Sequence, residues 1–166
     1  MTNETIQVAI IMGSDSDLPI VEAAFPILDS FGVTFTKNVM SAHRTPHDVM
    51  ELIKNSEQNG CKVFIAAAGM AAHLAGAVAA HSTKPVIGIP IESGGMGGID
   101  SLLSTAMMPP GVPVATVAVG KSGAKNSAIL AVQILATSND DLARKLKDFK
   151  ENMRAEVLEK DKKLNS

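Results

Sequence analysis

The chain has 166 residues, 46% hydrophobic and 19% charged, a composition that is typical of one globular domain and excludes an intrinsically disordered protein. Its formal net charge is −2 and it contains no Trp or Tyr, which argues against a nucleic-acid partner and against attraction to an anionic membrane. A single cysteine, Cys61, excludes an internal disulfide and fits a reducing cytoplasm.

The N-terminal segment, residues 1–17, lacks the basic region and the small-residue cleavage site of a secretory leader. Its apolar run of about seven residues is far shorter than the roughly 20 residues that a membrane-spanning helix needs. We therefore expect a cytoplasmic protein with no leader and no membrane partner.

Charged side chains are distributed unevenly, with 17 in residues 1–139 and 15 in residues 140–166. The first segment has few charges with which to cover the outer surface of a monomer. Because an exposed apolar surface usually marks an interface, we expect the chain to form a homo-oligomer.

Short apolar runs alternate with helical patterns along the chain. In chain order the patterns predict a strand at 6–12, a helix at 18–32, a strand at 33–40, a helix at 46–60, a strand at 61–69, a helix at 71–82, a strand at 85–91, a short helix ending near residue 107, a strand beginning near residue 112 and a helix at about 122–137. A charged helix at about 140–162 completes the chain.

Local signals mark several helix ends. Asp17 and Thr45 are predicted N-caps, each followed by a proline in the first turn, and Asn139 is the predicted N-cap of the terminal helix. Gly32 is expected to end the first helix. Pro26 lies inside that helix, where it predicts a kink.

The terminal helix carries a narrow apolar stripe of Leu142, Leu146, Phe149 and Met153. A stripe of this width predicts a helix that lies on the surface and is solvated on its far side. The helix at 71–82 is almost wholly small and apolar. We expect it either to be buried on most sides or to face another subunit.

The alternation of strands and helices predicts a single α/β domain over residues 1–166. We expect a parallel sheet of about five strands with helices on both faces and a C-terminal surface helix. In such folds ligands bind at the carboxyl ends of the strands, where the strand order reverses. The loops at 13–17, 41–46 and 69–74 follow predicted strands and are therefore the expected ligand site.

The loop GSDSD at 13–17 opens a helix. Its backbone N–H groups and serine hydroxyls can bind an anion, and the carboxylate of Asp17 can accept hydrogen bonds from ribose hydroxyls. The loop matches neither GxGxxG nor a Walker motif, which disfavours a dinucleotide or ATP site. The alternative interpretation is structural, with Asp17 as a helix cap and the serines shaping a turn.

The loop SAHRTP at 41–46 combines an imidazole, a guanidinium and a hydroxyl. Arg44 can hold a phosphate through two hydrogen bonds, and His43 can transfer a proton near neutral pH. The alternative is a solvated loop in which only Thr45 and Pro46 matter, as a helix start. A second histidine-bearing loop at the same sheet edge, AGMAAHLAG at 68–76, favours the functional interpretation.

The loop at 68–76 has almost no bulky side chains, so its backbone can approach a flat ligand closely. His73 lies near a helix start, where a structural role and a role in the site are both open. The remaining candidates, His47, His81 and Cys61, are predicted to be structural or exposed rather than chemical.

No cluster of histidine, cysteine and carboxylate residues has the spacing of metal ligands, and no GxSxG elbow is present. A metal site and a serine hydrolase are therefore disfavoured. The glycines at 94–98 indicate a mobile or closely packed loop rather than a phosphate cradle.

Five segments recur in this order in class I N5-carboxyaminoimidazole ribonucleotide mutases, the family often described as the catalytic subunit of phosphoribosylaminoimidazole carboxylase. They are GSDSD, SAHRTP, AGMAAHLAG, GIDSLLSTAMMPPGVPVATVAVG and the apolar helix that follows. The chain resembles this family over residues 6–160. The resemblance implies a flavodoxin-like three-layer fold, a homo-octamer and a reaction of purine biosynthesis without metal or organic cofactor. In that reaction a carboxylate leaves the exocyclic nitrogen of the ribonucleotide and is added to ring carbon C4.

The resemblance also assigns roles by position. His43 would be the general acid/base. The residues that would bind the ribonucleotide are Ser14, Asp17 and Arg44. The residues that would frame the ring and the carboxylate are Ser41, Gly69, Met70 and Ala71, with His73 and Leu74 at the border of the site.

Three positions depart from the family's usual pattern. Met70, Ala75 and Met107 stand where the family commonly has Gly, Pro and Gln. None of these changes removes a matched polar group, so they affect the shape of the pocket and not its chemistry.

Two other functions compete with the mutase. A sister class carboxylates aminoimidazole ribonucleotide directly with CO₂, but it usually carries Lys in place of Arg44 and lacks the AAHL segment at 71–74. A non-catalytic flavodoxin-like nucleotide-binding module needs no histidine, and a flavin site usually stacks its ring on an aromatic side chain. Both comparisons favour the mutase.

Overall fold

The computed structural model describes residues 5–166; the first four residues of the N-terminal segment, in which we expect no leader, lie outside the described part. Five strands form one sheet in the order β2-β1-β3-β4-β5, and every neighbouring pair is parallel. The strands are β1 (Val8–Met12), β2 (Phe35–Val39), β3 (Val63–Gly69), β4 (Val86–Ile91) and β5 (Ala115–Thr116).

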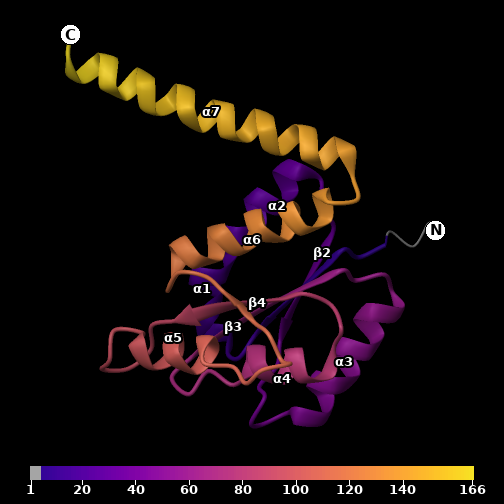
Figure 1. The fold of residues 1–166 in the computed structure, drawn as a ribbon. Coiled ribbons are helices and arrows are strands. Elements are labelled where there is room, and N and C mark those ends of the chain that lie inside the picture. The colour runs from indigo at the N-terminus through magenta and orange to yellow at the C-terminus, as the bar shows by residue number, and fades with distance from the viewer. Residues whose placement is uncertain (1–4) are drawn as a thin grey trace.

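Helices cover both faces of this sheet. Figure 1 shows α1, α2 and α6 on one face and α3, α4 and α5 on the other. The α-helices are α1 (Leu18–Val21), α2 (Phe25–Phe31), α3 (Pro46–Gln58), α4 (Leu74–His81), α5 (Ile99–Ala106), α6 (Lys121–Ala136) and α7 (Asp140–Leu164). The predicted flavodoxin-like three-layer fold is confirmed, and α7 lies outside the layer that contains α2 and α6.

The three central strands, β1, β3 and β4, are apolar on both sides because both faces of the sheet are covered there. Along β1, Val8 and Ile10 pack into the core beneath α2 and α6, whereas Ala9 and Ile11 pack into the core beneath α3 and α4. This period of two distributes the continuous apolar run between two cores. Within the described part of the chain, no helix combines the length and the apolar composition that crossing a membrane requires.

The first predicted helix is broken into two. A 3₁₀ turn, Glu22–Ala24, separates α1 from α2 just before Pro26. Proline has no N–H to offer the Glu22 carbonyl, which instead accepts from the N–H of Phe25. The predicted kink is therefore confirmed, and Gly32, with a φ of 73°, ends α2 as expected.

Two predicted elements are shorter than expected. The strand expected from residue 112 is reduced to the two residues of β5, since the Pro109–Pro113 segment contains three prolines that cannot donate to a ladder. The helix expected at 71–82 begins at Leu74. A tight turn precedes it, in which the N–H of Ala72 donates to the carbonyl of Met70 over 2.9 Å.

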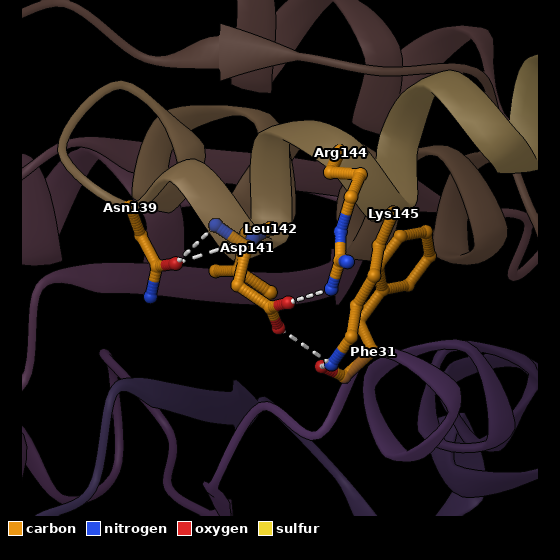
Figure 2. A network of polar contacts seen from close by, with 6 residues as sticks. All are labelled: Phe31, Asn139, Asp141, Leu142, Arg144 and Lys145. Atoms are coloured by element: carbon orange, nitrogen blue, oxygen red, sulfur yellow. Dashed lines mark hydrogen bonds and ion pairs between the residues drawn. The ribbon is translucent and has the colours of Figure 1, made fainter.

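Hydrogen bonds stabilise the start of α7 and join it to the rest of the domain (Figure 2). The side-chain oxygen of Asn139 accepts from the N–H groups of Asp141 and Leu142, both at 3.1 Å, which confirms the predicted N-cap. Lys145 donates to the carbonyl of Phe31 at the end of α2, over 3.2 Å. Hydrogen bonds from Lys145 and Arg144 lower the pKa of the exposed Asp141 carboxyl.

The distal half of α7 has no packing partner in the described chain. Leu142 is buried and Leu146 and Phe149 pack on the core, as predicted, but Met153 is 51% exposed. Every residue from 151 onward is exposed, and Figure 1 shows this part of α7 extending away from the domain. The predicted packing stripe thus ends at Phe149.

Candidate functional site

The site lies where the strand order reverses. The chain passes from β1 to β2 on one side and then crosses back to β3 on the other, so the loops after these strands diverge at the carboxyl edge of the sheet. A cavity of about 550 Å³ opens between them. All ten residues proposed from the sequence lie on its wall: Ser14, Asp17, Ser41, His43, Arg44, Gly69, Met70, Ala71, His73 and Leu74.

The loop after β1 is held by a capping box. The backbone N–H of Ser14 donates to the Asp17 carboxylate over 3.2 Å, while the Ser14 hydroxyl accepts from the N–H of Ser16 over 3.3 Å. The expectation that Asp17 caps α1 with its side chain is wrong, because the carboxylate turns back to the start of the preceding 3₁₀ turn. The geometry leaves the Ser14 and Ser16 hydroxyls exposed at the cavity wall.

Asp17 is 6% exposed, and this burial raises the pKa of its carboxyl. The hydrogen bond from Ser14 acts in the opposite direction and the charge of Asp15 adds to the rise. A buried carboxylate beside a cavity is suited to accepting hydrogen bonds from hydroxyl groups of a ligand, which would replace the water it has lost.

We expect Asp17→Asn to change the pH dependence of stability. A carboxyl with a raised folded-state pKa ionises first in the unfolded chain, so the folded state loses stability as pH rises from about 4 towards neutrality. The uncharged Asn side chain avoids this loss. The Tm of the variant relative to wild type should therefore increase between about pH 4 and pH 7, measured by differential scanning calorimetry.

Asp15→Asn is the matched control, since Asp15 is the exposed neighbour of Asp17 on the same turn. Because the charge of Asp15 contributes to the raised pKa of Asp17, the Tm of this variant relative to wild type should also increase over the same pH range, but by less than that of Asp17→Asn. A relative Tm of Asp17→Asn that falls with rising pH would contradict the assigned direction of the shift.

The loop after β2 is a compact turn closed by its own hydroxyls. Thr45 accepts from the N–H of Ser41 over 2.9 Å and donates to the Ser41 carbonyl over 3.0 Å. Thr45 occupies the N-cap position of α3, as predicted, but its side chain makes no capping bond because it closes this turn instead. The turn presents His43 and Arg44 to the cavity.

Arg44 connects the first two loops. Its Nη2 donates to the carbonyl of Gly13 over 3.2 Å, and its backbone N–H donates to the Ser41 hydroxyl over 3.2 Å. Arg44 is exposed, and no salt bridge joins it to a carboxylate within residues 5–166. The remaining guanidinium donors can therefore bind an anion in the cavity.

The loop after β3 forms the opposite wall. Gly69 allows a close approach there, since a Cβ at this position would lie 1.9 Å from Oγ of Ser93. Met70 has a φ of 55° and is the only residue other than glycine, among those described, with a positive φ. This conformation costs an L-residue about 1–2 kcal/mol. Leu74 is buried beneath the loop, and His73 is the first residue outside α4.

The two histidines of the site contact each other. Nε2 of His43 lies against Nδ1 of His73, with the ring centroids 4.6 Å apart and the ring planes at 82°. The residues are 30 positions apart in the chain and come from loops on either side of β1. Nothing in the local sequence of either loop predicted this contact.

Gly13, Ser16, Ala42, Ala68 and Ser93 also line the cavity; the first four belong to the loop segments identified from the sequence, whereas Ser93 was not singled out. Ser93 lies two residues after the end of β4, and β4 is the sheet neighbour of β3. The sequence signal was present, because a polar residue after a buried apolar strand marks the ligand edge of a parallel sheet. Only the strand order places that residue beside the loop after β3.

The remaining titratable candidates lie elsewhere. His47 and His81 are exposed and off the cavity wall, and Cys61 is buried, where desolvation raises the pKa of its thiol. These positions agree with the structural or exposed roles predicted for them. Within residues 5–166 no group of three or more His, Cys, Asp or Glu side chains is arranged to hold a metal ion.

The sequence profile of the family described as AIR carboxylase matches residues 7–156. A protein of Thermotoga maritima named N5-carboxyaminoimidazole ribonucleotide mutase is 51% identical over 158 residues, which cover 95% of this chain and 91% of the relative. A protein of Bacillus subtilis with the same name is 51% identical over 152 residues, covering 92% and 94%. The crystal structure of Treponema denticola PurE superposes with a TM-score of 0.88 at 30% identity, covering 96% of this chain and 99% of that structure.

Proposed function

Since the chain belongs to the AIR carboxylase family, we propose that it is an N5-carboxyaminoimidazole ribonucleotide mutase of purine biosynthesis. It acts on the cytoplasmic pool of its ribonucleotide substrate and needs no metal or organic cofactor. The observation that carries the proposal is the convergence in one cavity of a proton carrier, a free guanidinium and a buried carboxylate, contributed by His43, Arg44 and Asp17.

The ribonucleotide binds along the first two loops. Arg44 holds the phosphate with the guanidinium donors that Gly13 leaves free, and the Ser14 hydroxyl adds a further hydrogen bond. Asp17 accepts from the ribose hydroxyls. The aminoimidazole ring and its carboxylate then lie between Ser41 and the loop after β3, whose cavity residues are Gly69, Met70, Ala71, His73 and Leu74.

The reaction moves one carboxylate and two protons. His43 donates a proton to the exocyclic nitrogen, the C–N bond of the carbamate breaks, and CO₂ is released into the cavity. Carbon C4 of the ring then attacks CO₂, forming the new C–C bond. The proton on tetrahedral C4 returns to His43, which restores the aromatic ring and the starting state of the enzyme.

The cavity wall suits this intermediate. CO₂ is neutral and scarce in free solution, so confinement beside C4 supplies the effective concentration that recarboxylation needs. Ala68, Gly69, Met70 and Ala71 line one side of the cavity and present no charged side chain to it.

The deciding experiment uses substrate labelled with ¹³C in its N5-carboxylate. Purified enzyme is incubated with this substrate in EDTA, without ATP or added bicarbonate, and the product is followed by ¹³C NMR. A mutase retains the label at C4 even when excess unlabelled bicarbonate is added. A direct carboxylase would acquire its carboxylate from solution, and absence of any C4-carboxylated product would refute an activity on this substrate.

Oligomerisation forms a second part of the proposal, and exposed apolar surface supports it. Ile99 and Leu103 lie about one turn apart on α5, Met107 follows as the C-cap of this helix, and all three are more than half exposed. Met153 and Val157 continue the apolar stripe of α7 beyond the body of the domain and are also more than half exposed. A helix that projects into water gains little stability by itself, so a second copy is the natural partner for these faces.

We expect an octamer in solution, with a mass about eight times that of the chain, measured by size exclusion with light scattering. Val157→Asp should yield smaller species, because it places a charge on the exposed apolar stripe. Glu156→Ala, on the adjacent position, should leave the mass unchanged. A stable wild-type monomer at micromolar concentration would exclude this assembly.

A further inference from the structure

The contact between His43 and His73 joins the proposed proton carrier to a second imidazole. Nε2 of His43 and Nδ1 of His73 are the touching atoms, and the rings meet edge to face at 82°. Within residues 5–166 neither imidazole makes another hydrogen bond to the chain. The contact therefore leaves Nδ1 of His43 and Nε2 of His73 as the two outer nitrogens of the pair.

Two imidazole nitrogens in contact hold one hydrogen between them. Two bare nitrogens would repel through their lone pairs, and two N–H groups would clash, so one ring donates and the other accepts. The direction of this hydrogen bond decides the tautomer of both rings, because each neutral imidazole carries one hydrogen.

We propose that His73 is a positioning residue that accepts a hydrogen bond from Nε2–H of neutral His43, so that Nδ1 of His43 is the nitrogen that exchanges protons with the substrate. The inference rests on the proposed function and adds to it the atom that carries the proton. His73 acts through His43 and transfers no proton to the substrate.

The number of hydrogens on the two imidazoles favours a hydrogen bond from His43 to His73. With one positive charge, the pair carries three hydrogens: one on Nδ1 of His43, one in the bridge and one on Nε2 of His73. When His43 gives its Nδ1 hydrogen to the exocyclic nitrogen, the bridging hydrogen stays on Nε2 and Nδ1 becomes bare. The same Nδ1 then accepts the proton from C4, and the pair returns to its starting state.

The opposite direction of the hydrogen bond does not allow this proton cycle. If Nδ1 of His73 donated to Nε2 of His43, the neutral pair would carry a hydrogen on Nδ1 of His43. The bare nitrogen would then be Nε2 of His73, on the second ring. His43 would have no nitrogen free to accept the C4 proton, and the ring that gave the first proton could not take back the second.

The first test reads the hydrogen bond directly. Enzyme with ¹⁵N-labelled histidine is studied without substrate by solid-state NMR, at a pH where free histidine is neutral, with the spectra of His43→Asn and His73→Asn for assignment. We expect a scalar coupling across the hydrogen bond between Nε2 of His43 and Nδ1 of His73, with the hydrogen bonded to Nε2. A hydrogen bonded to Nδ1 of His73, or the absence of coupling, overturns the proposal.

The second test separates positioning from packing. Asn at position 73 places a carboxamide oxygen where Nδ1 of His73 lies, whereas Phe keeps the ring and removes the acceptor. We expect His73→Phe to lose about 10- to 100-fold in kcat, the usual scale for a lost orienting contact, with a smaller change in KM, and His73→Asn, which keeps an acceptor, to recover a large part of that loss. Equal losses in the two variants overturn the positioning role.

The two failures are distinguishable. A wild-type enzyme that does not isomerise its substrate refutes the proposed function, whereas the NMR experiment needs no turnover. Both position-73 variants should retain the wild-type mass in solution, which shows that any loss of kcat is not a loss of assembly.

Discussion

Replacing His43 by Asn is expected to lower turnover by at least about 100-fold, the usual scale of general acid–base catalysis. Asn has a similar size and retains a hydrogen-bonding side chain, but it cannot give a proton and take one back. The proton on C4 must leave for the product to regain its aromatic ring, so a base is required. The measurement is kcat for isomerisation, beside the Kd for substrate and the mass in solution, both of which should stay close to wild type.

His47→Asn is the matched control for this variant. His47 lies in the first turn of α3, only four residues from His43, but it is exposed and does not line the cavity. Its replacement should leave kcat unchanged. Near-normal turnover in His43→Asn together with an inactive His73→Asn would exchange the roles of the two residues. Activity in both variants would make the substrate or water the proton carrier and refute the mechanism.

Replacing Arg44 by Ala is expected to weaken substrate binding more than it slows the chemical step. Loss of a charge-assisted contact to phosphate costs about 1.5–3 kcal/mol, which corresponds to roughly 10- to 150-fold in Kd. The variant also loses the hydrogen bond to the Gly13 carbonyl, which joins the first two loops. Isothermal titration with substrate or product and steady-state kinetics together separate Kd from kcat.

Arg144→Ala provides the control for a lost arginine. Arg144 is 71% exposed and, among residues 5–166, pairs only with Asp141 on the same helix, so its removal should change neither Kd nor kcat. Arg44→Lys should recover part of the affinity, because a lysine keeps the charge but not the paired donors. Normal affinity with low turnover in Arg44→Ala would move this residue from phosphate binding into the chemical step.

Several features of the site follow from local sequence. Parallel strands bring their carboxyl ends to one edge, so polar residues that directly follow apolar runs must gather there whatever the details of packing. Chain direction therefore predicts that Ser14, His43 and His73 lie in one region, and the cavity contains all three. The roles assigned to these residues remain predictions.

Other expectations failed where a local signal had two possible outcomes. Asp17 and Thr45 occupy the expected helix starts, but their side chains bond elsewhere, since a hydroxyl or carboxylate selects among several nearby backbone partners. Met153 continues a helical stripe that the sequence assigns to packing, yet the domain ends before the stripe does. The periodicity of apolar residues indicates which side chains share one face of a helix, but it does not indicate whether another element packs against that face.

By itself the sequence determined the fold class, the sheet of parallel strands and the loops that hold the candidate site, because these depend on periodicity, helix signals and chain direction. Only the tertiary structure decided that Ser93 lies beside Gly69, that Arg44 reaches the Gly13 carbonyl and that the two imidazoles meet. These contacts join loops 24 to 31 residues apart, and they depend on strand order and on sub-ångström packing of side chains. Neither the strand order nor the packing of individual side chains produces a periodic pattern in the sequence.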